Sequence, residues 1–93
     1  MDALQNARAE IDAVDAQLAA LFERRMAAVL TVAQYKKEHG LPIFDAAREA
    51  VVLDRSAARI QDPALRPYYR DHVQHLMDVD KQYEAQVLGR NRA

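Results

Sequence analysis

The chain begins with an uninterrupted stretch of helix-forming residues. Between residues 2 and 39 there is neither glycine nor proline, and alanine, leucine, glutamate, arginine and glutamine dominate. Asp2 can cap the start of a helix, and Gly40 followed by Pro42 is a typical stop signal. A helix of about 37 residues is about 55 Å long, whereas a compact chain of 93 residues has a diameter of roughly 30–35 Å. The predicted helix therefore extends well beyond the rest of its own chain.

Two further helices are predicted after this stop. Asp45 is placed to be the N-cap of a second helix from Ala46 to about Ile60. A third helix is expected to begin near Pro63 or Pro67 and to end at about Leu88. Since no segment shows strand alternation or an internal repeat, the sequence predicts an all-α fold.

The composition is typical of a globular protein with one core. A length of 93 residues suits a single domain over residues 1–93. The net charge of −1 provides no broad positive field, so neither nucleic acid nor a membrane surface is expected as a partner. The absence of cysteine excludes a disulfide scaffold and thiolate metal sites. With no membrane-length apolar run and no signal-peptide pattern, a cytoplasmic location is expected.

An apolar stripe interrupted by two cations runs along the first predicted helix. In steps of three and four, it contains Ile11, Val14, Leu18, Leu21, Arg25, Val29, Val32 and Lys36. These positions fall within roughly 40° of one line on a helix. Burying an unpaired charge is expensive, so Arg25 and Lys36 predict an anion nearby. Their separation of about 16 Å suits a small ligand with negative groups toward both ends. The alternative is that both cations snorkel or pair with acidic side chains.

The length of the stripe predicts a second chain. The part of the helix that overhangs its own subunit is apolar, so it has to be covered, and an intertwined homodimer is the simplest solution. Arg8 lies about 25 Å along the axis from Arg25 and about 100° around it, too far to reach the same pocket. Across an antiparallel dimer it could serve the partner's pocket. Otherwise Arg8 is a solvated surface arginine.

Acidic residues recur on the other two helices. Asp45 and Glu49 share a face near a helix N-terminus, where backbone N–H groups favour anions; simple capping and an Arg48–Glu49 surface pair are the alternative. On the third helix Asp80 occupies an apolar position, and Glu84 follows one turn later. The stripe there is predicted to contain Val73, Leu76, Asp80, Tyr83 and Val87. Alternatively, both acids face solvent or pair with Lys81 or with the basic stripe.

These elements also form an ordered signature. It reads Arg8-x-x-Ile11-x-x-x-Asp15, Leu21-x-x-Arg24-Arg25, Val32-x-x-x-Lys36 and Gly40-Leu41-Pro42-Ile43-Phe44-Asp45-Ala46-Ala47-Arg48-Glu49. In order and spacing it resembles the all-helical class of chorismate mutases, over essentially the full chain. The resemblance implies three helices per subunit, with the first shared across a homodimer. It also implies two equivalent pockets, each completed by one residue of the partner.

The same resemblance implies an activity. Such enzymes rearrange chorismate, a dicarboxylate, to prephenate by a concerted [3,3] shift in phenylalanine and tyrosine biosynthesis, a branch of the shikimate pathway. The reaction has no covalent intermediate and uses no cofactor or metal. The enzyme holds the ether side chain over the ring and stabilises the charge that develops on the ether oxygen.

Roles for individual residues follow from the resemblance. Arg25 and the partner's Arg8 would clamp carboxylates, which the planar fork of arginine suits. Lys36 would reach a carboxylate and the ether oxygen. Glu49, together with the backbone of Asp45, would fix the ring hydroxyl. The remaining contacts would come from Arg48, supporting Glu49 or the substrate, and from apolar walls at Val32, Val52 and Met77.

Two positions depart from the commonest bacterial pattern. Asp80 and Glu84 stand where those enzymes usually carry serine and glutamine. Glutamine donates a hydrogen bond to the ether oxygen, but an ionised glutamate cannot, although some fungal members carry glutamate there. We hypothesise that Glu84 must be protonated, which burial and neighbouring negative charges would favour, to act as a catalytic residue beside Lys36 and Arg25. Asp80 should weaken carboxylate binding unless Lys81, itself unusual in a normally apolar wall, or an arginine compensates.

Other functions fit parts of this pattern. Related enzymes, 4-amino-4-deoxychorismate mutases and isochorismate-pyruvate lyases, use similar pockets, and an extra acid such as Asp80 or Glu84 could pair with a substrate amine. A non-catalytic mutase-like module that dimerises or regulates an aromatic-pathway enzyme is a second alternative, and a helical coiled-coil adaptor is a third. The joint presence of Arg8, Arg25, Lys36, Arg48 and Glu49 favours a working site.

Overall fold

The computed structural model describes residues 2–89, and this part of the chain is helical throughout apart from its connections. In chain order its elements are α1 (Ala3–Glu38), α2 (Ala46–Ala58), the short 3₁₀ helix η1 (Pro63–Leu65) and α3 (Arg66–Leu88). Residues 2–89 contain no strand. The predicted all-α fold with a very long first helix is confirmed.

The ends of α1 lie where the sequence predicts them. The carboxylate of Asp2 accepts a hydrogen bond from the backbone N–H of Gln5 at 2.8 Å, and the Gln5 side chain accepts one from the Asp2 N–H at 3.2 Å. Together the two bonds form a capping box. At the other end Gly40 has a φ of 62°, in the left-handed region that favours glycine, and the chain turns away from the helix axis.

The start of α2 is also confirmed, whereas its end is slightly earlier than predicted. The Asp45 carboxylate accepts from the backbone N–H of Arg48 at 3.0 Å, as expected of an N-cap. The helix ends at Ala58 rather than near Ile60. Both predicted starts of the third helix have a counterpart in the structure. A 3₁₀ turn begins at Pro63, and α3 follows it directly from Arg66, with Pro67 in its first turn.

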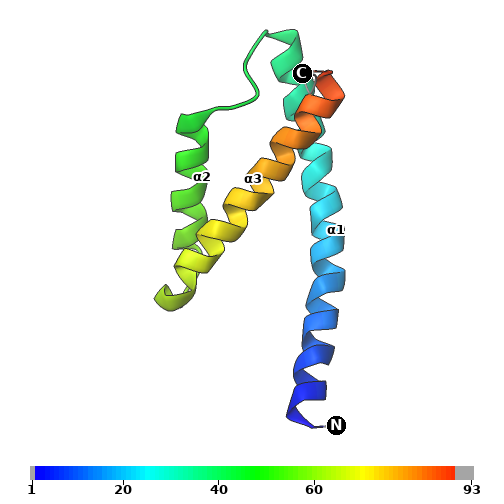
Figure 1. The fold of residues 1–93 in the computed structure, drawn as a ribbon, viewed down its shortest axis with the longest axis vertical. Coiled ribbons are helices and arrows are strands. Elements are labelled where there is room, and N and C mark those ends of the chain that lie inside the picture. Colours follow the sequence, from blue (N-terminus) through cyan, green and yellow to red (C-terminus); the bar gives the residue numbers. More distant parts are fainter. Residues whose placement is uncertain (1, 90–93) are drawn as a thin grey trace.

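The three helices do not form a compact bundle. In Figure 1, α3 crosses between the other two helices, and the N-terminal half of α1 extends away from both. The molecule measures 54 × 25 × 23 Å, and its radius of gyration of 16.5 Å exceeds the roughly 12 Å of a compact chain this long. Within the described residues α3 packs against both α1 and α2, but α1 and α2 do not pack against each other. A space bounded by all three helices therefore remains.

The buried core is small, and much of the predicted α1 stripe is uncovered. The buried apolar side chains are Ala33, Ala57, Val73 and Met77. Toward the N-terminus of the stripe, Ile11 is 56% exposed and Leu21 is 54% exposed. Side chains of this kind cost free energy when they face water, at about 25 cal/mol for each Å². This chain alone therefore leaves an apolar surface along α1.

The buried face of α3 matches the predicted stripe at Val73 and Asp80 but not at its other three positions. It passes through Val73, Met77, Asp80 and Glu84, not through Leu76, Tyr83 and Val87, which are half-buried or exposed. The difference arises because α3 packs against both α1 and α2, so the side chains of Met77 and Glu84 face these helices and are buried. Asp80 is buried, as its place in an apolar stripe suggested, and Glu84 is buried as well.

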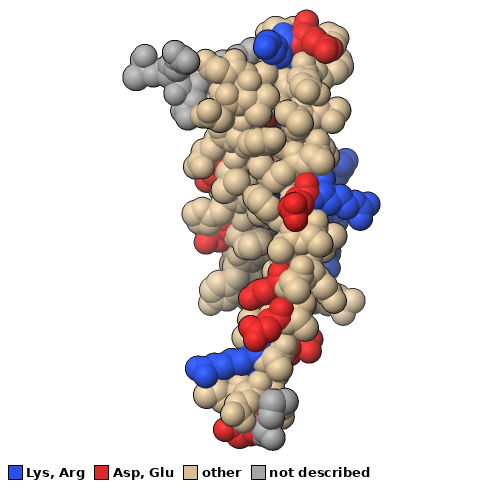
Figure 2. Space-filling model, turned by 90° about the vertical axis from the view of Figure 1, so that its right-hand side faces the viewer, with Lys and Arg blue, Asp and Glu red and all other residues tan. Residues whose placement is uncertain are grey.

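Side chains of both charges occur on the face of the described chain that Figure 2 shows. On the face seen from the side of α1, acidic and basic side chains are scattered among uncharged ones (Figure 2). None of the helices in residues 2–89 combines the length and the hydrophobicity that a membrane crossing requires.

Candidate active site

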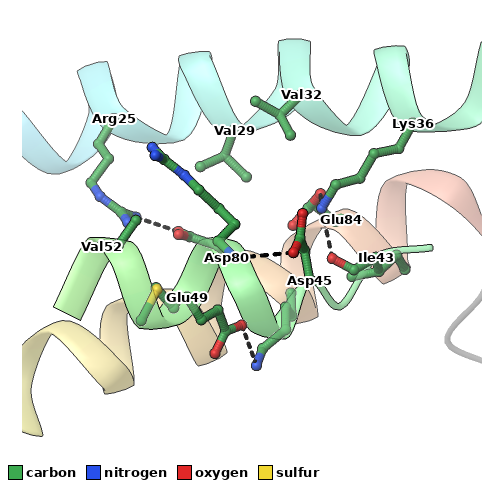
Figure 3. A pocket seen from close by; sticks show the side chains of 13 residues that line it. Arg25, Val29, Val32, Lys36, Ile43, Asp45, Glu49, Val52, Asp80 and Glu84 are labelled. Carbon is green, nitrogen blue, oxygen red and sulfur yellow. Dashed lines mark hydrogen bonds and ion pairs between the residues drawn. The ribbon is translucent and has the colours of Figure 1, made fainter. Parts of the chain in front are cut away.

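A cavity of about 170 Å³ lies in the space bounded by α1, α2 and α3 (Figure 3). Arg25, Val29, Val32 and Lys36 reach it from α1, which places the predicted cationic stripe on its wall. Its charged lining consists of Arg25, Lys36, Asp45, Arg48, Glu49, Asp80, Lys81 and Glu84. Its apolar lining consists of Val29, Val32, Ile43, Val52 and Met77. The charges balance, with four cations and four acids.

The two stripe cations are each paired with an acid of α3. A guanidinium nitrogen of Arg25, Nη1, donates to Asp80 Oδ1. The ammonium of Lys36 lies 2.9 Å from Glu84 Oε1 and donates to the backbone carbonyl of Ile43 at 2.6 Å. The alternative that these cations pair with acids is therefore what the structure shows. An arginine, and not Lys81, compensates the charge of Asp80.

Glu84 is held in an unusual position for an acid. Its side chain is 5% exposed, and the ammonium of Lys36 lies 2.9 Å from its Oε1. The contact is an ion pair without the alignment of a hydrogen bond, so Oε1 is buried with no hydrogen-bond donor among the described residues. The sequence predicts negative neighbours for Glu84, but the structure places a positive one, the ammonium of Lys36, in contact with it.

A second network ties α2 to α3 at the other wall of the cavity. Lys81 Nζ lies 2.8 Å from Glu49 Oε2 and 3.4 Å from Asp78 Oδ1, and it sits 4.8 Å from the centre of the Phe44 ring. The amide of Gln74 donates to Glu49 Oε1 at 3.2 Å and to Asp78 at 3.1 Å. The hydrogen bond to Glu49 raises the pKa of Lys81 against the opposing effect of desolvation. The hydrogen bond from Gln74 lowers the pKa of Asp78.

Arg48 and Arg8 are placed differently from the other predicted site residues. The Arg48 side chain lines the cavity, and within the described part of the chain its guanidinium has no ion pair, so Glu49 is supported by Lys81 and Gln74 instead. Arg8 is exposed on the N-terminal half of α1 and does not line this cavity. The sequence-based placement of Arg8 outside its own pocket agrees with the structure.

Three lining residues have no binding role in the site that the resemblance implies, namely Val29, Ile43 and Lys81. Val29 lies between the two cations of the stripe and could have been added from periodicity alone. Lys81 stands at a wall position in the resemblance, without a role of its own. Ile43 contributes its backbone carbonyl, which accepts a hydrogen bond from Lys36. A backbone contact of this kind leaves no side-chain motif in the sequence.

The arrangement suits binding and electrostatic stabilisation of an anion. The lining contains no serine, threonine, cysteine or histidine. Among residues 2–89 no cluster of three or more histidine, aspartate or glutamate side chains could hold a metal ion. What the cavity offers is cationic N–H donors on several sides and apolar walls between them, an environment in which preorganised charges act strongly.

Comparison with known proteins agrees with this geometry. The model of a family described as chorismate mutase type II matches residues 7–85, a span that contains the whole lining of the cavity. This chain belongs to the chorismate mutase type II family. The resemblance seen in the sequence is confirmed.

Two curated relatives cover part of the chain. Over 53 residues it is 43% identical to the T-protein of Haemophilus influenzae, which corresponds to 57% of this chain and 14% of that protein. Over 62 residues it is 39% identical to a 4-amino-4-deoxychorismate mutase of Streptomyces venezuelae, or 67% of this chain and 60% of that protein. The chain therefore spans less than two thirds of either relative. No solved structure matches it.

Proposed function

We propose that this protein is a cytoplasmic chorismate mutase, which rearranges chorismate to prephenate. The observation that carries this proposal is the joint projection of Arg25 and Lys36 from one face of α1 into the cavity (Figure 3). Two cations on one wall match the two carboxylates of chorismate. Membership of the chorismate mutase type II family supports the same reaction.

The rearrangement needs positioning and charge stabilisation, which these side chains can supply. Arg25 has five N–H donors in a planar fork, so it can keep Asp80 and still bind a substrate carboxylate. Lys36 has three donors, of which one bonds to the Ile43 carbonyl. Its contact with Glu84 is an ion pair without the alignment of a hydrogen bond, so a donor is left for the substrate. The ammonium charge of Lys36 would stabilise the ether oxygen as the C–O bond breaks. The apolar walls at Val32, Val52 and Met77 would hold the ring.

The wall of the pocket formed by α2 and its N-cap would orient the ring. Glu49 would accept a hydrogen bond from the ring hydroxyl, and the backbone of Asp45 at the α2 N-terminus would assist. Arg48, whose guanidinium is unpaired within the described residues, is available for a substrate carboxylate. Glu84 in its protonated form would donate to the ether oxygen beside Lys36.

We also propose that the functional unit is a homodimer. The uncovered stripe around Leu18 and Leu21 adjoins an apolar hollow of about 250 Å³ between α1 and α3, lined by Leu18, Leu21, Phe22, Arg25, His72 and Leu76. An antiparallel α1 of a second copy would cover this surface. It would also carry the partner's Arg8 toward the cavity, where it would bind a substrate carboxylate.

A second candidate reaction uses an amine-bearing substrate. Its support is the relative named 4-amino-4-deoxychorismate mutase, together with the four acids that line the cavity. An ammonium on the ring could pair with one of these acids. The two candidates differ in the substituent that the pocket accepts at one ring position.

The direct test is turnover of both substrates by the purified protein. We expect chorismate absorbance to disappear with formation of prephenate, without any added cofactor or metal. Rearrangement of only the 4-amino analogue would favour the second candidate. If neither compound is converted, the catalytic proposal is wrong, and a binding or regulatory role of the same fold would take its place.

The chemistry of Glu84 predicts a pH-dependent rate. An ionised carboxylate cannot donate to the ether oxygen and also holds Lys36, so a mechanism that needs the protonated acid predicts a kcat/KM that falls from about pH 5 to about pH 8. The Glu84→Gln variant carries an amide that donates at every pH. It should therefore keep its activity and show a flatter profile over the same range. A wild-type profile as flat as that of the variant would rule out a protonated Glu84 in catalysis.

A further inference from the structure

The Glu49 carboxylate is already occupied before any substrate binds. Lys81 Nζ lies 2.8 Å from one oxygen, and the Gln74 amide donates to the other at 3.2 Å. The Glu49 side chain is 15% exposed and that of Lys81 is 27% exposed, so solvent screens this pair only in part. Both residues line the cavity. A full positive charge therefore stands beside the acid that would meet the substrate ring.

The chemistry of the proposed substrate indicates which group meets Glu49. Chorismate carries two carboxylates, an ether oxygen and one hydroxyl. Glu49 repels the carboxylates, which Arg25 and Lys36 attract to the α1 wall. The hydroxyl is the one neutral donor on the molecule, so it is the group that a carboxylate acceptor selects. This step rests on the proposed function.

We propose that Lys81 is a specificity-determining residue, which makes this pocket select a substrate with a neutral hydroxyl over one with an ammonium at the same ring position. An ammonium bound to Glu49 would stand close to the ammonium of Lys81, with both cations sharing one carboxylate. A hydroxyl can share the same acceptor without that repulsion.

The surroundings of Lys81 hold its charge in place. The Phe44 ring lies 4.8 Å from the ammonium, and Asp78 lies 3.4 Å away. Asp78 offsets part of the positive charge, but its side chain is 45% exposed, against 15% for Glu49. Solvent therefore weakens its influence on the cavity. The positive charge of Lys81 therefore still acts on groups in the cavity, where Glu49 lies.

The ratio of kcat/KM for chorismate to kcat/KM for 4-amino-4-deoxychorismate tests this proposal. Wild type should favour chorismate, and Lys81→Met should lower the ratio by about tenfold, because Glu49 then presents an unpaired negative charge. Lys81→Gln can keep a hydrogen bond to Glu49 without the charge and should lower the ratio similarly. Lys81→Arg retains the charge and should restore the wild-type ratio.

The remaining lysine outside the cavity provides the matched control. Lys37 is exposed near the end of α1 and does not line the cavity, so Lys37→Met changes the net charge equally and should leave the ratio unchanged. An unchanged ratio in both neutral Lys81 variants would overturn the proposal while leaving the mutase assignment intact. So would a wild type that prefers the amino analogue. If wild type converts neither substrate, the proposed function fails first, and this proposal fails with it.

Discussion

Replacing Lys36 by methionine is expected to reduce kcat/KM for chorismate by about 10³-fold, the loss typical of removing one preorganised donor to a developing oxyanion. Methionine keeps much of the apolar stem and removes the ammonium. Steady-state kinetics of prephenate formation give the measurement. The adjacent Lys37→Met variant removes the same charge outside the cavity and should stay within about twofold of wild type. An active Lys36→Met enzyme would contradict the proposed mechanism.

This substitution also removes the partner of a buried acid. Its effect on stability therefore has to be measured separately from its effect on catalysis. The Glu84 side chain is 5% exposed, and the ammonium of Lys36 lies 2.9 Å from its Oε1. Breaking a buried ion pair by deleting one member costs about 3–5 kcal/mol. The double variant Lys36→Met with Glu84→Gln leaves no unpaired charge, so its thermal unfolding should return toward that of wild type. Its activity should remain low, because the ammonium is still missing.

The helices and one wall of the pocket could be predicted from local sequence signals. Residues 2–39 lack breakers, and the caps at Asp2 and Asp45 depend on hydrogen bonds that span only three residues. The 11-residue spacing of Arg25 and Lys36 fixes their common face for any straight helix. The overhang of α1 follows from its length in the same way.

The pairing between helices could not be predicted, because it depends on how the helices pack. Helical spacing shows that Arg25 needs an anion, but the choice of Asp80 depends on the register of α3 against α1. Likewise, Glu49 lies one residue from Arg48 in sequence, yet its partners are Lys81 and Gln74 on the neighbouring helix. Adjacent residues on a helix point about 100° apart, whereas side chains on two packed helices can point directly toward each other.

The pairs also change how substrate binding should be understood. In the free chain each stripe cation already contacts a carboxylate, so a dicarboxylate does not enter a site of unpaired positive charge. It has to share Arg25 with Asp80 and Lys36 with Glu84. Arg48, which is unpaired within the described residues, is one further cation for the substrate. We expect the partner's Arg8 to be another.

Mixing two inactive variants should restore activity if Arg8 acts across subunits. Arg8→Ala alone should lower kcat/KM by about 10²-fold, since it removes one carboxylate contact. When Arg8→Ala and Lys36→Met chains are unfolded together and refolded, half of the dimers should contain one chain of each kind. In these dimers one pocket combines an intact Lys36 with an intact Arg8 from the other chain. About a quarter of wild-type activity should return.

The matched control replaces the Lys36→Met chain by one that carries both substitutions. Mixed dimers then contain no pocket with both an intact Arg8 and an intact Lys36, so refolding with the Arg8→Ala chain should give no recovery. Sedimentation of wild type should show a dimer, because the apolar α1 surface around Leu18 and Leu21 requires cover. Were Arg8 to act within its own chain, the first mixture would stay as inactive as the control, since no chain in it carries both residues. The recovery therefore distinguishes a shared pocket from a self-contained one.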